Sequence, residues 1–184
     1  MDLLFSGTSP VVGQWYERTS AAIDGMPPHV TLLWPWRPAP VTAADLDTVA
    51  EVVAGVRRFS ISFQRCGAFT GALYLAPEPD HLLYELMHHL AARFQTPHRI
   101  EASSGRPCPH MTVAKSESQD VLAKIRATLE AELSERPLIV QATSHGNTNG
   151  CHIAPTMRGE HPKPCWRAEH HSENSAGKPH KPGP

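Results

Sequence analysis

Apolar residues recur along the first 143 residues with two different periods. Where they alternate with polar residues, as Phe59, Ile61 and Phe63 do, the pattern predicts a half-buried strand. Where they recur at every third or fourth position, as Leu86 and Leu90 do, it predicts a helix. Strands are predicted at residues 2–6, 26–36, 59–64, 71–76, 109–115 and 138–142, and helices over residues 9–16, 42–56, 77–94 and 120–133. Thr42 can cap the second of these helices. This order predicts a mixed α+β fold with two similar halves.

The chain changes character after residue 143. Residues 145–184 hold six of the 12 histidines and six of the 18 prolines, but few large apolar side chains. Such a segment buries too little apolar surface to offset the roughly 1 to 2 kcal/mol of backbone entropy lost per ordered residue. We therefore expect one domain over residues 1–143 and a disordered, His- and Pro-rich tail over residues 144–184.

Composition and charge exclude several classes of protein. The 17 Lys and Arg residues balance the 18 Asp and Glu residues, so a net charge of -1 gives no general attraction to nucleic acid or acidic membranes. No apolar run approaches the roughly 18 residues that span a bilayer, so no membrane partner is expected. The four cysteines form no Cys-x-x-Cys pair, and the start of the sequence shows no signal-segment pattern. We expect a cytoplasmic monomer in which any phosphate recognition is local.

One five-residue pattern occurs twice. Pro-His-Val-Thr-Leu at residues 28–32 recurs as Pro-His-Met-Thr-Val at residues 109–113, and each copy lies in a predicted strand. The composition gives roughly 0.01 such matches by chance, so two copies are unlikely to be accidental. Because successive side chains of a strand alternate between its faces, the histidine and threonine of each copy project together, and the apolar residues project toward a core.

His29 and His110, together with Thr31 and Thr112, suit phosphodiester chemistry without a metal ion. Imidazole has an unperturbed pKa of about 6.5, so near neutral pH one ring can be neutral while the other is protonated. One histidine would take a proton from water or a ribose hydroxyl, and the other would protonate the leaving oxygen. The threonine hydroxyls suit the non-bridging phosphate oxygens. The similarity of the two copies leaves the assignment of acid and base open, and no cofactor is expected.

These motifs resemble those of the 2H phosphoesterase superfamily, whose hallmark is two His-x-Thr/Ser-x motifs. The likeness is closest to the 2′,5′ RNA ligase (LigT-like) branch, and it extends in order and spacing over residues 27–36, 69–79 and 109–115. The resemblance implies a two-lobed, pseudo-symmetric α+β fold in which antiparallel sheets line a central cleft and helices lie outside. It also implies metal-independent chemistry on cyclic or 2′,5′-linked ribonucleotide phosphodiesters, with RNA termini or cyclic nucleotides as substrates.

Four further residues are candidate substrate contacts. Trp34 can stack on a base, and Arg37 and Lys115 can bind phosphate. Tyr74 lies in a predicted strand, but the pattern around it does not settle which face it occupies. Each candidate has an ordinary alternative, namely packing between lobes for the tryptophan and a solvated charge for Arg37 and Lys115.

The cysteines and histidines of the tail invite a zinc-site interpretation. The spacing of these residues matches no usual zinc finger or ribbon, and prolines interrupt the segment; the set includes Cys151, His152, His161 and Cys165. We therefore expect no structural metal.

Two classes of function stay open. The leading hypothesis is a metal-independent phosphodiesterase, with RNA ligase activity as a second reaction. The alternative is a non-catalytic phosphate- or RNA-binding module with a compromised second lobe. The presence of both histidines favours the enzyme, because binding alone does not need two proton-transfer groups.

Overall fold

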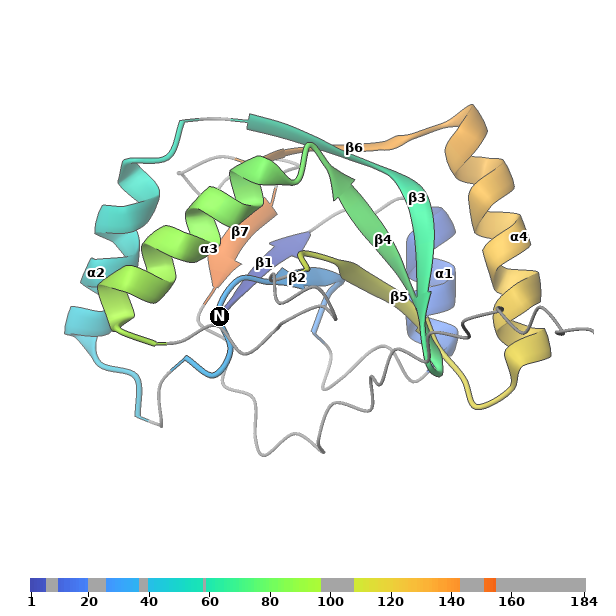
Figure 1. The fold of residues 1–184 in the computed structure, drawn as a ribbon, viewed down its shortest axis with the longest axis horizontal. Helices are drawn as coiled ribbons and strands as arrows, with labels where there is room; N and C mark the ends of the chain where they lie inside the picture. The colour runs from blue at the N-terminus through green and yellow to red at the C-terminus, as the bar shows by residue number, and fades with distance from the viewer. Residues whose placement is uncertain are drawn as a thin grey trace, which may run out of the picture.

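Seven strands and four helices make up the described part of the chain (Figure 1). The computed structural model describes residues 1–5, 10–19, 26–36, 40–57, 59–96, 108–142 and 151–154. The elements follow in the order β1 (Asp2–Phe5), α1 (Pro10–Arg18), β2 (His29–Thr31), α2 (Ala43–Ala54), β3 (Phe59–Phe69), β4 (Ala72–Glu78), α3 (His81–Phe94), β5 (Met111–Lys115), α4 (Gln119–Glu135), β6 (Leu138–Ala142) and β7 (Cys151–Ala154). None of the helices in these ranges is long and apolar enough to cross a membrane.

The strands form one continuous sheet that closes on itself in the order β1-β2-β5-β4-β3-β6-β7. Neighbouring strands are antiparallel except β6 and β7, whose parallel contact pairs Ala142 with Cys151. The longest pairing joins β3 and β4, from Ser62 opposite Glu78 to Phe69 opposite Ala72. The predicted α+β fold with antiparallel strands is confirmed.

The helices gather in two pairs at opposite ends of the sheet (Figure 1). At one end α1 contacts α4, and these helices pack against β5 and β3; at the other end α2 contacts α3. The buried residues of the two longest helices recur at helical spacing: Leu83, Leu86, Met87, Leu90 and Phe94 in α3, and Leu122, Ile125, Leu129 and Leu133 in α4. The two helix pairs mark two lobes, but the lobes share one continuous sheet, in which β2 and β5 are neighbours, instead of the separate sheets that were expected.

Side chains fix where α2 and α4 begin. The backbone N–H of Asp45 donates to Thr42 Oγ1 at 3.2 Å, while the N–H of Thr42 donates to Asp45 Oδ2 at 3.0 Å. This capping box satisfies N–H groups that the first turn leaves without helical partners, and it confirms the predicted cap at Thr42. Ser118 accepts the N–H of Val121 at 3.4 Å, so α4 begins at Gln119, one residue earlier than the pattern predicts.

The second strand is shorter than predicted. The pattern predicts a strand over residues 26–36, but only His29–Thr31 pairs as one. The N–H groups of Leu32 and Leu33 both donate to the Met1 carbonyl, at 3.0 and 3.2 Å, which ends the regular ladder. Pro35 then has no N–H with which to resume it.

A strand occurs inside the segment that was expected to be a disordered tail. All four residues of β7 pair with β1, from Ala154 opposite Asp2 to Cys151 opposite Phe5. The expected disorder is therefore wrong for residues 151–154, and a domain boundary at residue 143 separates them from the sheet to which they belong. Main-chain pairing holds this short strand, and such pairing leaves little trace in apolar periodicity. Residues 143–150 and 155–184 lie outside the described ranges.

Candidate active site

The two copies of the repeated pattern are neighbours in the sheet. Val30 in β2 pairs with Met111 in β5, and both side chains are fully buried. Because side chains alternate along a strand, the histidine and threonine that flank each of these residues project from the opposite face of the sheet. We call this opposite face, which carries His29, Thr31, His110 and Thr112, the motif face.

Each motif histidine lies opposite a threonine of the other strand. The antiparallel pairing of the central residues puts His29 opposite Thr112 and Thr31 opposite His110. Side chains at directly opposed positions have Cβ atoms roughly 4.5–5.5 Å apart. The two motif strands are therefore adjacent in one sheet, and their four polar side chains form one patch.

Both imidazole rings are anchored in the same way. His29 Nδ1 lies 3.1 Å from the carbonyl oxygen of Pro27, and His110 Nδ1 lies 2.7 Å from that of Cys108. A carbonyl oxygen can only accept, so Nδ1 carries the proton in each hydrogen bond. In both rings Nε2 is then the atom at which a proton is gained or lost.

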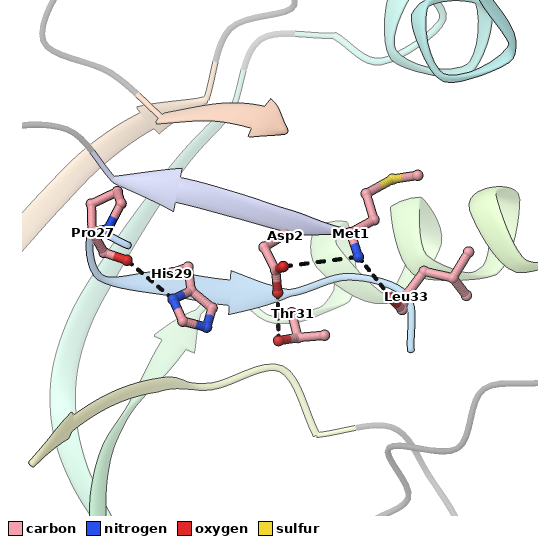
Figure 2. A network of polar contacts seen from close by, with 6 residues as sticks. All are labelled: Met1, Asp2, Pro27, His29, Thr31 and Leu33. Atoms are coloured by element: carbon pink, nitrogen blue, oxygen red, sulfur yellow. Dashed lines mark hydrogen bonds and ion pairs between the residues drawn. The ribbon is translucent and has the colours of Figure 1, made fainter. Parts of the chain in front are cut away.

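Thr31 contacts a buried carboxylate (Figure 2). Its Oγ1 donates to Asp2 Oδ1 at 2.7 Å, from the position directly opposite in β1. Asp2 is fully buried, and its Oδ2 lies 3.8 Å from the amino nitrogen of Met1, which donates to the Leu33 carbonyl at 3.0 Å. Sequence reasoning missed Asp2 because 29 residues separate it from Thr31. The available signal was one acidic residue at the start of an otherwise apolar strand.

Two aromatic rings flank His110 on the motif face. Phe69 and Tyr74 stack with ring centroids 4.3 Å apart and an interplanar angle of 23°. The His110 ring meets both at steep angles, with centroids 5.0 Å from Phe69 and 5.5 Å from Tyr74. Tyr74 also pairs with Thr112 across β4 and β5. Tyr74 therefore lies on the motif face, which the sequence pattern alone did not settle. Phe69 is a candidate site residue that the sequence did not indicate.

Gly67 provides the space in which the Tyr74 ring lies. The two residues pair across β3 and β4. A Cβ atom built on Gly67 would lie 2.6 Å from Cε2 of Tyr74 and 2.5 Å from its hydroxyl oxygen, too close for any ordinary contact. Glycine inside a strand often marks such a close approach. At this position it lets the ring lie over β3, where it borders His110.

A β-bulge in β5 brings Lys115 to the motif face. Thr112 pairs with Tyr74 of β4, and Ala114 pairs with the adjacent residue Leu73, so Val113 is an extra residue without a partner position in β4. Ala114 is fully buried, and Lys115, the next residue, is half-buried and pairs with Ala72. Strict alternation would have turned Lys115 toward the core, whereas the bulge restores it to the side of Thr112.

The tryptophans that follow β2 differ in their surroundings. Trp36 is buried and meets Phe94 of α3 edge-on, with centroids 5.5 Å apart, so it packs within a lobe. Trp34 is half-buried and stays a candidate substrate contact. Arg37 lies outside the described residues.

Burial keeps nearby titratable groups neutral. It raises the pKa of Cys66 to about 11, against the opposing charge of Arg126. Burial is also the main cause that raises the pKa of Tyr74 and of Cys108. Arg126 Nη2 donates to the Cys66 carbonyl at 3.2 Å, and its Nε donates to Glu130 at 2.7 Å. Neither thiol nor the phenol therefore adds negative charge near the motif face at neutral pH.

The motif face has the groups for proton transfer and anion binding. Two anchored imidazoles can exchange protons, and hydroxyl and ammonium groups can contact phosphate oxygens. Within the described ranges, no three or more His, Cys, Asp or Glu side chains are placed to hold a metal ion.

Comparison with known proteins gives one family match. A family model of the 2′-5′ RNA ligase superfamily matches residues 8–144, which is more than half of the chain and includes both copies of the repeated pattern. A search of curated proteins gives no match.

Proposed function

Because the chain belongs to the 2′-5′ RNA ligase superfamily, as its two motifs predicted, we propose that it is a metal-independent phosphodiesterase acting on cyclic or 2′,5′-linked ribonucleotide phosphodiesters. The observation that carries the proposal is the register of β2 and β5, because it gathers two anchored imidazoles and two hydroxyls on one face. The substrates would be RNA termini or cyclic nucleotides. RNA ligation is a second reaction, in which a ribose 5′-hydroxyl replaces water as the nucleophile: its oxygen bonds to phosphorus as a P–O bond of a 2′,3′-cyclic phosphate breaks.

The proposed reaction transfers one proton at each histidine. One ring, neutral at Nε2, takes a proton from the attacking water as the water oxygen bonds to phosphorus. The other ring, protonated at Nε2, gives its proton to the ribose oxygen as the P–O bond breaks. The two rings thereby exchange protonation states, and solvent restores them before the next turnover. The similar Nδ1 anchors support either assignment of acid and base.

Phosphate contacts are proposed from the same face. Thr112 would donate its hydroxyl proton to a non-bridging oxygen, and the Lys115 ammonium would offset the phosphate charge. Thr112 projects on the side of the motif histidines by strand alternation, and the bulge in β5 turns Lys115 to the same side. Arg37 is proposed as a further phosphate contact.

The nucleoside would lie against aromatic side chains. The stacked pair of Phe69 and Tyr74 forms a wall next to one imidazole. A base that stacks on such a ring gains about 1 to 3 kcal/mol, and this gain depends little on which base it is. Trp34 is proposed as a second stacking contact.

Hydrolysis of 2′,3′-cyclic nucleotides and of a 2′,5′-linked dinucleotide by the full chain tests the proposal. Turnover should persist in EDTA, since the proposed transfers use no cation, and His29→Ala or His110→Ala should lower its rate about a hundredfold or more. His89→Ala is the matched control, because His89 is an exposed histidine on α3. Restoration of an EDTA-treated sample by Zn²⁺ would contradict the mechanism. Tight nucleotide binding without turnover would instead support the binding-module alternative.

A further inference from the structure

The carboxylate of Asp2 makes the two motif threonines different from each other. Thr31 Oγ1 donates to Asp2 Oδ1 at 2.7 Å, and Asp2 is fully buried (Figure 2). A hydroxyl group has one proton to donate. While this hydrogen bond holds, Thr31 can offer only its lone pairs to a substrate.

Among the described residues, no carboxylate lies at the position beside Thr112 that corresponds to Asp2. β2 and β5 form an antiparallel pair at the centre of four neighbouring strands. β1 lies beside β2, and β4 lies beside β5 at the corresponding position. Asp2 lies opposite Thr31 in β1, and Tyr74 lies opposite Thr112 in β4. The two lobes thus have an acid and an aromatic ring at corresponding positions. The side chain at the position that corresponds to Asp2 is therefore a phenol and not a carboxylate.

The two threonines therefore suit different parts of a substrate. Phosphate oxygens at neutral pH need donors, and a donor is what Thr112 can provide. The Met1 amino group lies 3.8 Å from Asp2 Oδ2, whereas Oδ1 is the carboxylate oxygen next to Thr31, where its negative charge disfavours a phosphate oxygen. An O–H group of the substrate or of water can donate to Thr31 Oγ1, because it needs no proton from Thr31 and carries no negative charge that Asp2 would repel.

We propose that Asp2 is a positioning residue that makes Thr31 an acceptor for the attacking water, and that Thr112 is the threonine that donates to the phosphate. The water then gives one proton to a histidine and directs its other O–H at Thr31. This inference rests on the proposed function for its substrate. The binding measurement that tests it requires no turnover.

Calorimetric titration of the full chain with 2′-AMP, a phosphate monoester, separates the two roles. Thr112→Val should weaken binding about tenfold or more, because a hydrogen bond to a charged group is lost. Thr31→Val should leave binding within about twofold, because the lost hydroxyl does not donate to phosphate. Asp2→Asn should strengthen binding several-fold, since it removes a negative charge while its amide oxygen still accepts from Thr31.

Kinetics distinguish positioning from a purely structural effect. Thr31→Val should lower kcat with little change in KM, and Thr31→Ser should restore kcat because the serine hydroxyl can also donate to Asp2. Thermal unfolding confirms that each variant is folded. Equal loss of 2′-AMP binding in Thr31→Val and Thr112→Val would overturn the proposed role of Asp2 but not the proposed function. Weaker binding in folded Asp2→Asn would do the same. A native protein that binds no 2′-AMP would overturn this inference and the proposed function together.

Discussion

Val30 and Met111 pair at the centre of the repeated motif, and both are completely buried. Because their strands are antiparallel, a local twofold axis between these two residues exchanges one motif with the other. Below the axis, each strand contributes one buried apolar side chain to the core. On the motif face the two halves differ, since Asp2 lies opposite Thr31 and Tyr74 lies opposite Thr112.

Replacement of either motif histidine by alanine should lower the rate of cyclic nucleotide hydrolysis by about 10² to 10⁴, the usual contribution of a general acid or base. The native protein should show a bell-shaped dependence of kcat/KM on pH, and each variant should lose one limb of it. The limb that each variant loses identifies the base and the acid. The double variant should lose less than the product of the two single effects if the rings act as a unit. Undiminished rates in a folded single variant would refute the catalytic assignment.

Gly67→Ala should displace the Tyr74 ring, because the added methyl group would occupy the position of the ring. We expect a loss of about 1 to 3 kcal/mol in the free energy of unfolding, as for other overpacked sites, together with a higher KM for nucleotides. Gly13→Ala is the matched control. Gly13 lies in α1, and a Cβ atom added there would have nothing within 4 Å, so its replacement should stabilise the helix by about 0.5 to 1 kcal/mol. Urea unfolding and steady-state kinetics measure both effects, and an unchanged KM in Gly67→Ala would argue against a substrate contact at Tyr74.

The sequence predicts those parts of the site that follow from local rules. Strand alternation predicts that His29 and Thr31 share a face, and a threonine directly before the helical spacing predicts that Thr42 caps α2. Both features depend on residues only two or three positions apart, and both are present.

Features that depend on pairing between distant strands were not predicted. Asp2 and Phe69 reach the motif face through their partners in neighbouring strands, and neither carries a local motif. The bulge at Val113 changes which side Lys115 occupies, although the residues around it read as a regular strand. Apolar periodicity likewise missed β7, because a four-residue strand is held mainly by its hydrogen bonds to β1.

A chain that ends at residue 143 should be less stable than one that ends at residue 156. The shorter chain lacks β7, and the four residues of β1 then lose their pairing on that side. We expect a loss of about 1 to 3 kcal/mol, because each lost hydrogen bond contributes about 0.5 to 1.5 kcal/mol. Activity should fall as well, since β1 holds Asp2 against Thr31. Denaturant unfolding of both chains and of the full chain measures the difference, and equal stability of the two truncated chains would show that β7 contributes little.

The free energy of unfolding should fall as pH rises above about 8.5, and Cys66 should contribute to this fall. Burial raises the pKa of Cys66 to about 11 in the folded protein, whereas an exposed thiol in the unfolded chain has a pKa of about 8.5. Between these values unfolding releases a proton, so stability is retained below the lower pKa and declines by at most about 1.4 kcal/mol per pH unit above it. The raised pKa values of Cys108 and Tyr74 act in the same direction. Urea unfolding from about pH 7.5 to about pH 10 should give a shallower decline for Cys66→Ala than for the native chain, whatever the absolute stability of the variant. Identical slopes for the two proteins would mean that the Cys66 thiol titrates in the folded state as it does in the unfolded chain.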